Sequence, residues 1–281
     1  MKSNSGRASR TAVIVATART PIGRAGKGSL VEFRPDDLAA FAVRSALAKV
    51  PQLDPTTLDD VYLGCGLPGG ESGFNMARVV NVLNGLDMVP GATVNRYCSS
   101  SIQTTRMAFH AIAAGEGDAF VSAGVETVSR FFKGTSDHLP DTQNPFFAGA
   151  AERTAQYAEG GQDWHDPRLD GELPDVYIAM GQTAENVARL TGVTREEMDR
   201  FAVRSQNLAE QATNNGFWAR EITPVTRADG TVISTDDGPR SGVTYEAVSQ
   251  LAPVFRPDGR VTAGNCCPLN DGAAAVVVMS D

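Results

Sequence analysis

This sequence lacks the patterns that build metal centres, disulfide frameworks or membrane spans. It has only 4 cysteines in 281 residues, and the spacing of Cys65, Cys98, Cys266 and Cys267 matches no metal-ligand pattern. The two adjacent cysteines are poorly placed to bridge to each other, so we expect four reduced thiols and a cytoplasmic protein. No apolar run is long enough to cross a membrane.

Positive charge is also scarce. Lys and Arg number 25 against 33 Asp and Glu, which gives a formal net charge of −8. A general nucleic-acid binder needs a basic surface to displace counterions, so this class is excluded. A phosphate-bearing ligand needs only a local cluster, and five arginines offer one: Arg220, Arg227, Arg240, Arg256 and Arg260. The same residues also fit a scattered, solvated set, and the sequence leaves both interpretations open.

A nucleotide-binding P-loop is missing as well. Gly64, Gly66, Gly69 and Gly70 follow an apolar segment, but their spacing and the lack of a lysine do not match that motif. The proportions of hydrophobic and charged residues, 42% and 21%, are ordinary for a globular protein. Basic residues before the segment 11–17 imitate a signal peptide, but an apolar core of about seven residues fits a buried first strand better.

Apolar segments and helical patterns alternate along the first part of the chain. Strands are predicted at 12–16, 61–64, 91–94 and 119–122. Helices are predicted at 35–50, at 76–83 and directly after Cys98. This alternation favours a largely parallel sheet with helices on its faces, in which reactive groups gather at the carboxyl ends of the strands.

The pattern changes after about residue 128. The segment 131–175 is rich in Gly, Pro, Asp and Asn and has few periodic apolar positions, which indicates a long excursion from the sheet. Helices are predicted at 183–190 and 195–214, the latter with Thr194 and Glu197 in capping-box relation. Its expected apolar side is Met198, Phe201, Ala202, Leu208 and Ala209. A hairpin at 222–226 and 231–235 and a central strand at 273–279 complete the prediction.

Cys98 is the strongest candidate for chemistry. It stands between the extended segment 91–94 and a helix whose apolar positions include Ile102, Phe109 and Ile112. Unpaired N–H groups and the positive dipole end at the first turn of a helix favour a thiolate, so Cys98 is a candidate nucleophile. The alternative is a small apolar residue buried under the helix.

The segment Asn-Arg-Tyr-Cys-Ser-Ser-Ser-Ile-Gln at 95–103 resembles the acyl-accepting segment of the thiolase family. Other blocks in register resemble the same family: 19–23, 123–127, 180–187, 262–265 and 270–274. The resemblance implies an α/β fold with a βαβαβαββ mixed sheet, helices on both faces and an inserted, mainly helical loop domain. It assigns residues 1–127 and 262–281 to the N-terminal α/β domain and residues 128–261 to the insertion, with the family's second half absent.

By this resemblance the protein is an acyltransferase that transfers an acyl group between a 3-ketoacyl-CoA and CoA, by thiolysis or by the reverse Claisen condensation. Cys98 would carry the acyl group. Coenzyme A is a substrate, no covalently bound cofactor is expected, and the partners are acyl-CoA, CoA and further copies in a homodimer or homotetramer.

The resemblance also implies positions that bind substrate. Met180, Phe255 and Ala263 match residues along the pantetheine and acyl channel, and Arg240 matches an arginine at the nucleotide end of CoA. Cys267 stands where the family usually has a serine near the thioester. Two other departures concern Ala179, where many short-chain thiolases have histidine, and Ser101, where glycine is usual.

The family's base, in a Gly-His-Pro segment, and its second cysteine, in a Cys-X-Gly-Gly segment, have no counterpart in these residues. His110, His138 and His165 match neither motif and are interpreted as structural or solvated. We therefore expect this chain alone to be inactive in the full cycle, because such groups act as a unit. Two alternatives are a ketoacyl synthase-like condensing enzyme and a non-catalytic protein that binds CoA or lipid thioesters.

Overall fold

The computed structural model describes residues 10–131, 133 and 139–281. The chain divides into two compact units. The first contains residues 1–136, 216–238 and 269–281, and the second contains 137–215 and 239–268. In the described residues, no helix combines the length and hydropathy needed to cross a membrane.

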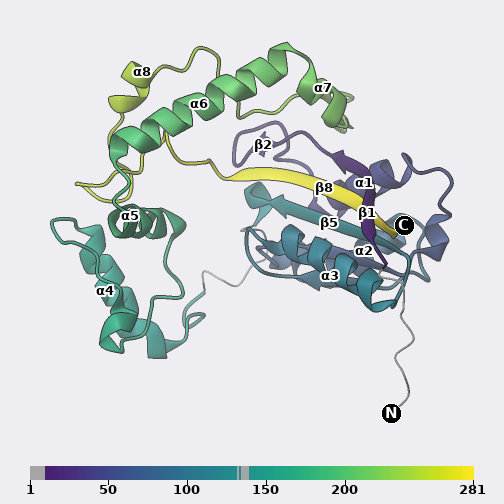
Figure 1. Cartoon of the computed structure of the whole chain (residues 1–281), viewed down its shortest axis with the longest axis horizontal. Coiled ribbons are helices and arrows are strands. Elements are labelled where there is room, and N and C mark those ends of the chain that lie inside the picture. The colour runs from purple at the N-terminus through teal and green to yellow at the C-terminus, as the bar shows by residue number, and fades with distance from the viewer. Residues whose placement is uncertain (1–9, 132, 134–138) are drawn as a thin grey trace. The chain divides into compact units, whose positions relative to one another are not determined.

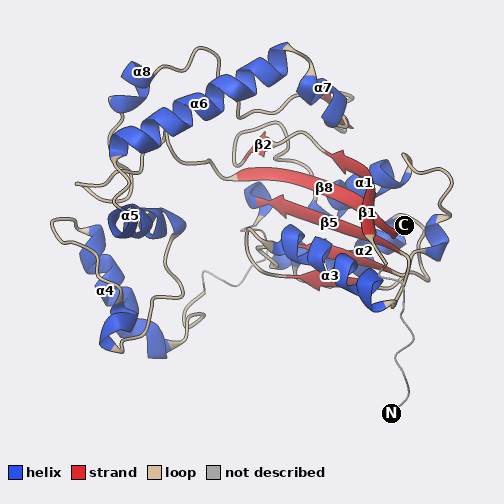
Figure 2. Ribbon diagram, viewed as in Figure 1, coloured by secondary structure: helices blue, strands red, loops and turns tan. Residues whose placement is uncertain are grey.

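A mixed sheet forms the centre of the first unit, as predicted (Figures 1 and 2). Its strands are β1 (Ala12–Arg19), β2 (Gly23–Arg24), β3 (Asp60–Gly64), β4 (Gly91–Val94), β5 (Ala119–Thr127) and β8 (Asn270–Ser280). The main order is β1-β8-β5-β3-β4, and β2 pairs with β8. β4, β3 and β5 are parallel, whereas β8 is antiparallel to both β5 and β1.

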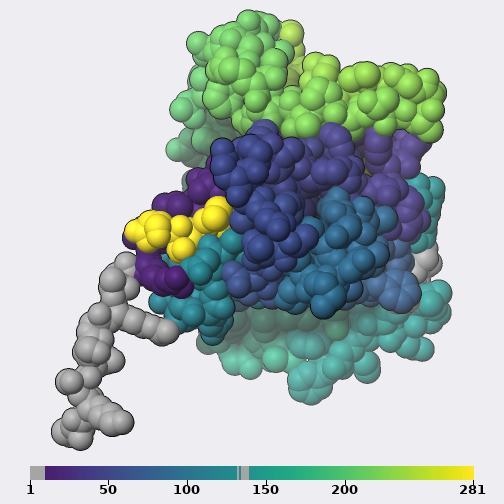
Figure 3. All heavy atoms as spheres, turned by 90° about the vertical axis from the view of Figure 1, so that its right-hand side faces the viewer, coloured from purple at the N-terminus to yellow at the C-terminus, as the bar shows by residue number. Residues whose placement is uncertain are grey.

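β8 is the central strand that the apolar run predicts. Ala275, Val277 and Val278 are buried, and backbone pairs on both sides satisfy the strand. The space-filling view shows the last residues (yellow) beside the first strand (purple), where Asp281 N–H donates to Thr11 (Figure 3). A long apolar run without alternation is the expected pattern of a strand that is covered on both faces.

The prediction that the first strand is buried is wrong for much of β1. Val13, Ile14 and Val15 are 37%, 56% and 43% exposed. β1 is the first strand of the sheet order, with β8 as its partner strand and one further bridge from Arg19 to Ile222, and its ladder with β8 shifts register between Ile14 and Ala16. Only Ala16 and Ala18 are buried, because the apolar composition of an edge strand does not itself supply a covering layer.

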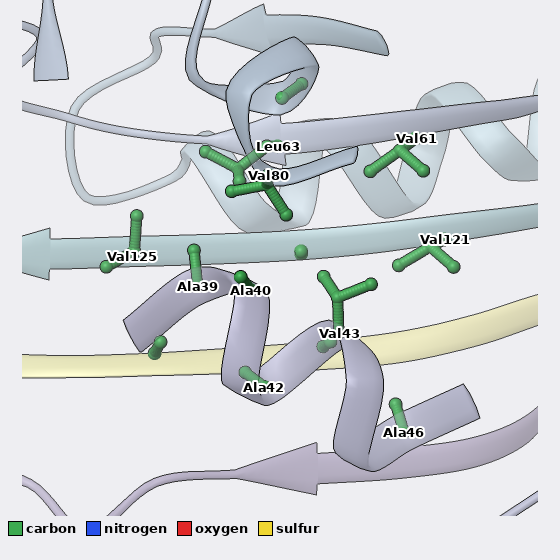
Figure 4. Packing of buried hydrophobic residues seen from close by; sticks show 14 of the residues in the cluster. Ala39, Ala40, Ala42, Val43, Ala46, Val61, Leu63, Val80, Val121 and Val125 are labelled. Carbon is green, nitrogen blue, oxygen red and sulfur yellow. The ribbon is translucent and has the colours of Figure 1, made fainter. Parts of the chain in front are cut away.

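Two helices, α1 (Pro35–Leu47) and α2 (Met76–Leu83), cover one face of the sheet. Small side chains of α1 let it approach closely, and Val43 packs with Val61 and Val121 from the strands (Figure 4). Each fully buried valine or leucine of this core contributes about 1.5–3 kcal/mol of transfer free energy. Pro35 at the first helical position and Asp36 in the first turn favour the start of α1.

The opposite face carries α3 (Ser100–Ala114), which ends at Gly115 with φ 75°. Ala108, Ala111 and Ile112 pack against Phe120 and Val278 of the sheet. The predicted helix is confirmed, but its inward side differs from the prediction. Ile102 and Phe109 are 74% and 49% exposed, since small residues and Thr104 face the sheet instead.

The second unit is mainly helical. Its helices are α4 (Ala148–Ala158), α5 (Met180–Thr191), α6 (Arg195–Asn214) and α8 (Tyr245–Ser249). The Thr194–Glu197 capping box at the start of α6 is confirmed. The predicted apolar side of α6 is not buried, because Phe201 and Leu208 are exposed and Asp199 is the buried residue of this helix. α4 was not predicted, since its alanines and polar residues give little apolar periodicity.

Residues 216–238 form α7 (Phe217–Glu221) and the predicted hairpin, β6 (Val225–Thr226) with β7 (Val232–Ile233). This segment is predicted to belong to the insertion, but it lies in the first compact unit. Thr223 N–H donates to Arg19 C=O at 2.8 Å, and the Arg19 guanidinium makes two bonds of 2.9 and 3.0 Å to Asp236. The described residues 128–131 and 133, and residues 262–268, also fall in different units from those predicted. The division into functional domains stays a prediction.

Short 3₁₀ helices fill several connections. They span Pro55–Thr57, Gly70–Ser72, Val128–Arg130, Pro145–Phe147 and Pro167–Asp170. Proline opens three of them and fixes the backbone for a tight turn.

Candidate functional site

The five residues 95–99, here called the Cys98 turn, connect β4 to α3. Tyr97 has φ 47°, a left-handed conformation that side chains rarely adopt. Asn95 Oδ1 accepts the Tyr97 N–H at 2.8 Å, and Ser100 Oγ accepts the Arg96 N–H at 2.8 Å. Ser100 Oγ also donates to the Tyr97 carbonyl at 2.6 Å. Side chains at both ends of the turn therefore hold its backbone.

Cys98 lies at the strand-to-helix junction that the sequence predicts, and it is exposed. α3 begins at Ser100 with Ser99 as N-cap, so Cys98 precedes the cap rather than lying in the first turn. The alternative interpretation, a cysteine buried under the helix, is wrong. An exposed thiol beside the start of a 15-residue helix is accessible to an electrophile.

Two glycines let the start of α3 approach the sheet. A Cβ at Gly64 would lie 2.7 Å from the Ser101 nitrogen, and a Cβ at Gly124 would overlap Ser101 Oγ. Both glycines stand in neighbouring parallel strands and are paired in register. The Ser101 side chain thus fills the space that the missing Cβ of Gly124 leaves.

The loop after β3 lies beside the Cys98 turn and contains a second, different thiol. Cys65 is buried, and burial raises its pKa to about 12, with Glu126 adding to the shift. Glu126 accepts N–H bonds from Gly66 and Leu67, and burial raises its pKa although these bonds oppose the shift. Cys65 is therefore an inert thiol next to the exposed Cys98.

The predicted CoA-binding residues lie in the second unit, whereas Cys98 lies in the first. Met180 begins α5 and is 65% exposed. Phe255 packs its ring on Gly181, where a Cβ would overlap it, and Gln182 Nε2 donates to the Phe255 carbonyl at 2.8 Å. The structure thus brings Phe255 to the start of α5, as a shared channel wall would require.

Buried polar side chains of α5 hold the segment that carries Phe255. Arg256 is 4% exposed and donates to Gln182 Oε1 at 2.7 Å and to Asn186 Oδ1 at 2.6 Å. Glu185 is 2% exposed and accepts the N–H groups of Arg260 and Val261. Burial lowers the pKa of Arg256. This polar network gives Gln182, Glu185 and Asn186 of α5 their hydrogen-bond partners.

The segment that contains Ala263 is fixed by Asn265. Asn265 Oδ1 accepts the Thr262 N–H at 2.8 Å, and its Nδ2 donates to Asp199 Oδ1 at 2.9 Å. Ala263 and Cys267 are exposed on this loop. The Thr-Ala-Gly-Asn block at 262–265 therefore forms a loop that is held by hydrogen bonds of Asn265 and leaves Ala263 exposed.

Arg240 is exposed, and its backbone N–H donates to Gln206 of α6 at 3.0 Å. The five arginines of the proposed cluster are divided between the units, Arg220 and Arg227 in the first and the others in the second. Arg256 and Arg260 are occupied with internal hydrogen bonds. A single cluster inside one unit is thus not observed.

Two of the three histidines lie in the part of the chain that the structure describes. His110 lies against the Phe109 ring, with centroids 5.4 Å apart. His165 Nε2 contacts Asp170 at 3.0 Å. His138 lies outside the described residues.

The supporting roles of Glu126, Glu185, Arg256 and Asn265 were not predicted, and Arg256 was considered only as part of an arginine cluster. Glu126, Glu185 and Asn265 stand inside blocks that resemble the family. A charged or amide residue inside such a block could have indicated a supporting role, because a polar side chain that becomes buried needs a hydrogen-bond partner.

Comparison with known proteins gives consistent matches. The family described as "Thiolase, N-terminal domain" matches residues 12–281. A beta-ketoadipyl-CoA thiolase of Pseudomonas knackmussii is 39% identical over 282 residues, which cover 97% of this chain and 66% of that protein. A 3-ketoacyl-CoA thiolase of Bacillus subtilis is 38% identical over 283 residues, with coverages of 96% and 66%.

Solved structures show the same similarity. The acetyl-CoA acetyltransferase of Bacillus anthracis superposes with a TM-score of 0.77 at 33% identity, covering 98% of this chain and 67% of that one. Human mitochondrial 3-ketoacyl-CoA thiolase in complex with CoA gives 0.75 at 29% identity, with coverages of 97% and 65%. This chain spans about two thirds of the length of these proteins, 65–67%.

Proposed function

This chain belongs to the thiolase family, and from that premise we propose that it carries the acyl-accepting cysteine of a thiolase, Cys98. The activity proposed is acyl transfer between a 3-ketoacyl-CoA and CoA. The observation that supports the role most directly is the exposed Cys98 on a held turn in front of α3.

In the degradative direction the Cys98 thiolate adds to the C3 carbonyl carbon of a 3-ketoacyl-CoA. The C2–C3 bond then breaks, its electron pair stays on C2, and protonation of C2 releases acetyl-CoA. The thiolate of a second CoA attacks the acyl-cysteine, which returns the Cys98 thiolate and forms the shortened acyl-CoA. Each addition places negative charge on an oxygen, which N–H groups near the start of α3 are suited to stabilise.

We further propose that Met180, Phe255, Ala263 and Cys267 line the acyl and pantetheine channel and that Arg240 binds the nucleotide end of CoA. Support comes from the contact of Phe255 with the start of α5 and from the exposure of Met180, Ala263 and Cys267. A homodimer or homotetramer and a cytoplasmic location remain predictions.

Acylation of the chain by acetoacetyl-CoA tests the proposal. Intact-mass analysis should show one slow acetyl addition, and peptide mapping should place it on Cys98. The chain holds no Gly-His-Pro or Cys-X-Gly-Gly segment, so continuous release of acetyl-CoA is not expected from it alone.

Cys98→Ala should abolish the acetyl addition, and Cys266→Ala, also at an exposed thiol, should leave it on Cys98. Acetylation that persists in Cys98→Ala at the wild-type rate would refute the role of Cys98. CoA binding without any acylation would instead favour the non-catalytic binding protein.

A further inference from the structure

Glu126, at the carboxyl end of β5, binds three consecutive residues of the loop after β3. Its Oε2 accepts the Gly66 N–H at 2.8 Å, and its Oε1 accepts the Leu67 N–H at 3.0 Å. The Cys65 thiol donates to Oε1 at 3.6 Å. The carboxylate is held by backbone amides and a thiol rather than by a basic side chain, and burial raises its pKa.

Gly66 places this loop directly against the Cys98 turn. A Cβ at Gly66 would lie 2.9 Å from Glu126 Oε2, 3.1 Å from the Tyr97 carbonyl carbon and 3.2 Å from its oxygen. The Cys65 N–H donates to the Val94 carbonyl at 3.1 Å. Gly66 is therefore enclosed between the Glu126 carboxylate and the backbone of Tyr97.

Sheet topology explains this arrangement. β5, β3 and β4 are adjacent and parallel, so their carboxyl ends lie at the same end of the sheet. Glu126, the 65–67 loop and the Cys98 turn are therefore all found there. Tyr97 has a positive φ, which a non-glycine residue keeps only when its surroundings fix it. Besides the side chains of Asn95 and Ser100, the 65–67 loop lies against Tyr97 and is in a position to do so.

We propose that Glu126 is a positioning residue for Cys98: its carboxylate fixes the 65–67 loop against Tyr97, and that loop holds the turn that presents the Cys98 thiol. The proposal rests on the proposed function, since it concerns the same cysteine. Glutamine at this position keeps the size but turns one acceptor into an NH₂ donor that faces a backbone N–H.

Hydrogen exchange measured by mass spectrometry on the full 281-residue chain tests the proposal. The reporters are three amides bonded within or next to the turn: Ser99 to Arg96, Ser100 to Tyr97 and Gln103 to Ser99. Glu126→Gln should speed their exchange about tenfold, because the loop that supports them loses an anchoring bond. Glu221→Gln is the matched control, since Glu221 pairs with Arg19 of β1, which stands at the other end of the strand order from β4.

Exchange at the turn that stays at the wild-type rate in Glu126→Gln would overturn the proposal. So would equal acceleration in Glu221→Gln, because this would indicate general destabilisation. Glu126→Asp, which keeps a carboxylate, should restore part of the protection. If Glu126→Gln does not fold, Gly66→Ala replaces it as the test. The added Cβ would press on both Glu126 Oε2 and the Tyr97 carbonyl, and it should speed hydrogen exchange at the same three amides.

Alkylation of Cys98 by iodoacetamide across pH gives a second measurement. Glu126→Gln should slow the reaction of Cys98 about tenfold and move its pH profile, whereas Cys267 should react as in the wild type. The exchange result does not depend on Cys98 chemistry. A wild-type Cys98 that is never acylated therefore refutes the proposed function, while unchanged exchange refutes the positioning role alone.

Discussion

Ser101 and Gly124 are matched to each other. The thiolase resemblance leads one to expect glycine at 101, and the serine found there occupies the space over Gly124. This makes the two positions a compensating pair, because a side chain can stand at one of them only when the other is small.

Gly124→Ala should therefore lower the free energy of unfolding by about 1–2 kcal/mol, since its Cβ meets Ser101 Oγ. Adding Ser101→Gly should recover most of this loss, because the Gly64 carbonyl at 3.5 Å is then the nearest atom left. Urea unfolding of the wild type, both single variants and the double variant measures the coupling. Purely additive effects would contradict the pairing.

Glu71 gives a pH-dependent prediction. Hydrogen bonds from Arg130 lower its pKa below the ordinary 4.5, with Arg34 contributing. The folded state thus favours the carboxylate, and this stability is present above pH 4.5 and lost as the pH falls through the lowered folded-state pKa.

Glu71→Gln should therefore cost about 1 kcal/mol near neutral pH, and the difference from the wild type should disappear in acid. Thermal or urea unfolding at a series of pH values measures it. Glu32→Gln, at an exposed carboxylate nearby, serves as the control and should show little difference at any pH. A Glu71 effect that grows on acidification would contradict the assignment.

Among the elements, those with local signals were predicted well. The capping box fixed the start of α6, Gly115 fixed the end of α3, and α2 and β4 have the predicted bounds. The exposure of β1, α3 and α6 was not predictable, because periodicity shows which residues share a face and not whether another layer covers that face.

The α6 cap can be tested by itself. Thr194→Ala should lower the stability of the second unit by about 1 kcal/mol. The Thr194 hydroxyl accepts the Glu197 N–H, and alanine has no side-chain atom that can accept this bond. Thr213→Ala, the same substitution near the other end of α6, should change stability by less than about 0.5 kcal/mol. Hydrogen exchange of α6 amides measures both, and equal effects would rule out a specific cap.

At the scale of the whole molecule, the two units are stabilised differently. Among the described residues, the buried hydrophobic ones in the second unit are Ala150, Ala188, Val248 and Val261, whereas the first unit has the extended sheet core. The second unit relies more on buried polar contacts of Glu185 and Arg256. The sequence indicated two regions but not this difference, because the partners of a buried charge lie about 70 residues away.

Glu185→Gln should destabilise the second unit by about 1–3 kcal/mol, because an NH₂ group would then face the N–H of Arg260 or Val261. Hydrogen exchange resolved by segment should show faster exchange in 137–215 and 239–268, with the sheet of the first unit little changed. Glu196→Gln, at a 58% exposed carboxylate, is the control. Equal acceleration in both units would contradict independent stability.

The position of β8 has a consequence for how the chain is made. Ala12 pairs with Ser280, so during synthesis β1 leaves the ribosome long before the strand that pairs with it exists. Until β8 exists, β1 with its exposed residues Val13, Ile14 and Val15 has no partner strand in this sheet. The side of β5 that later pairs with β8 also lacks its partner strand. A nascent chain halted before residue 270 would thus present two unfinished strand edges, and a protective chaperone would be most needed in that interval.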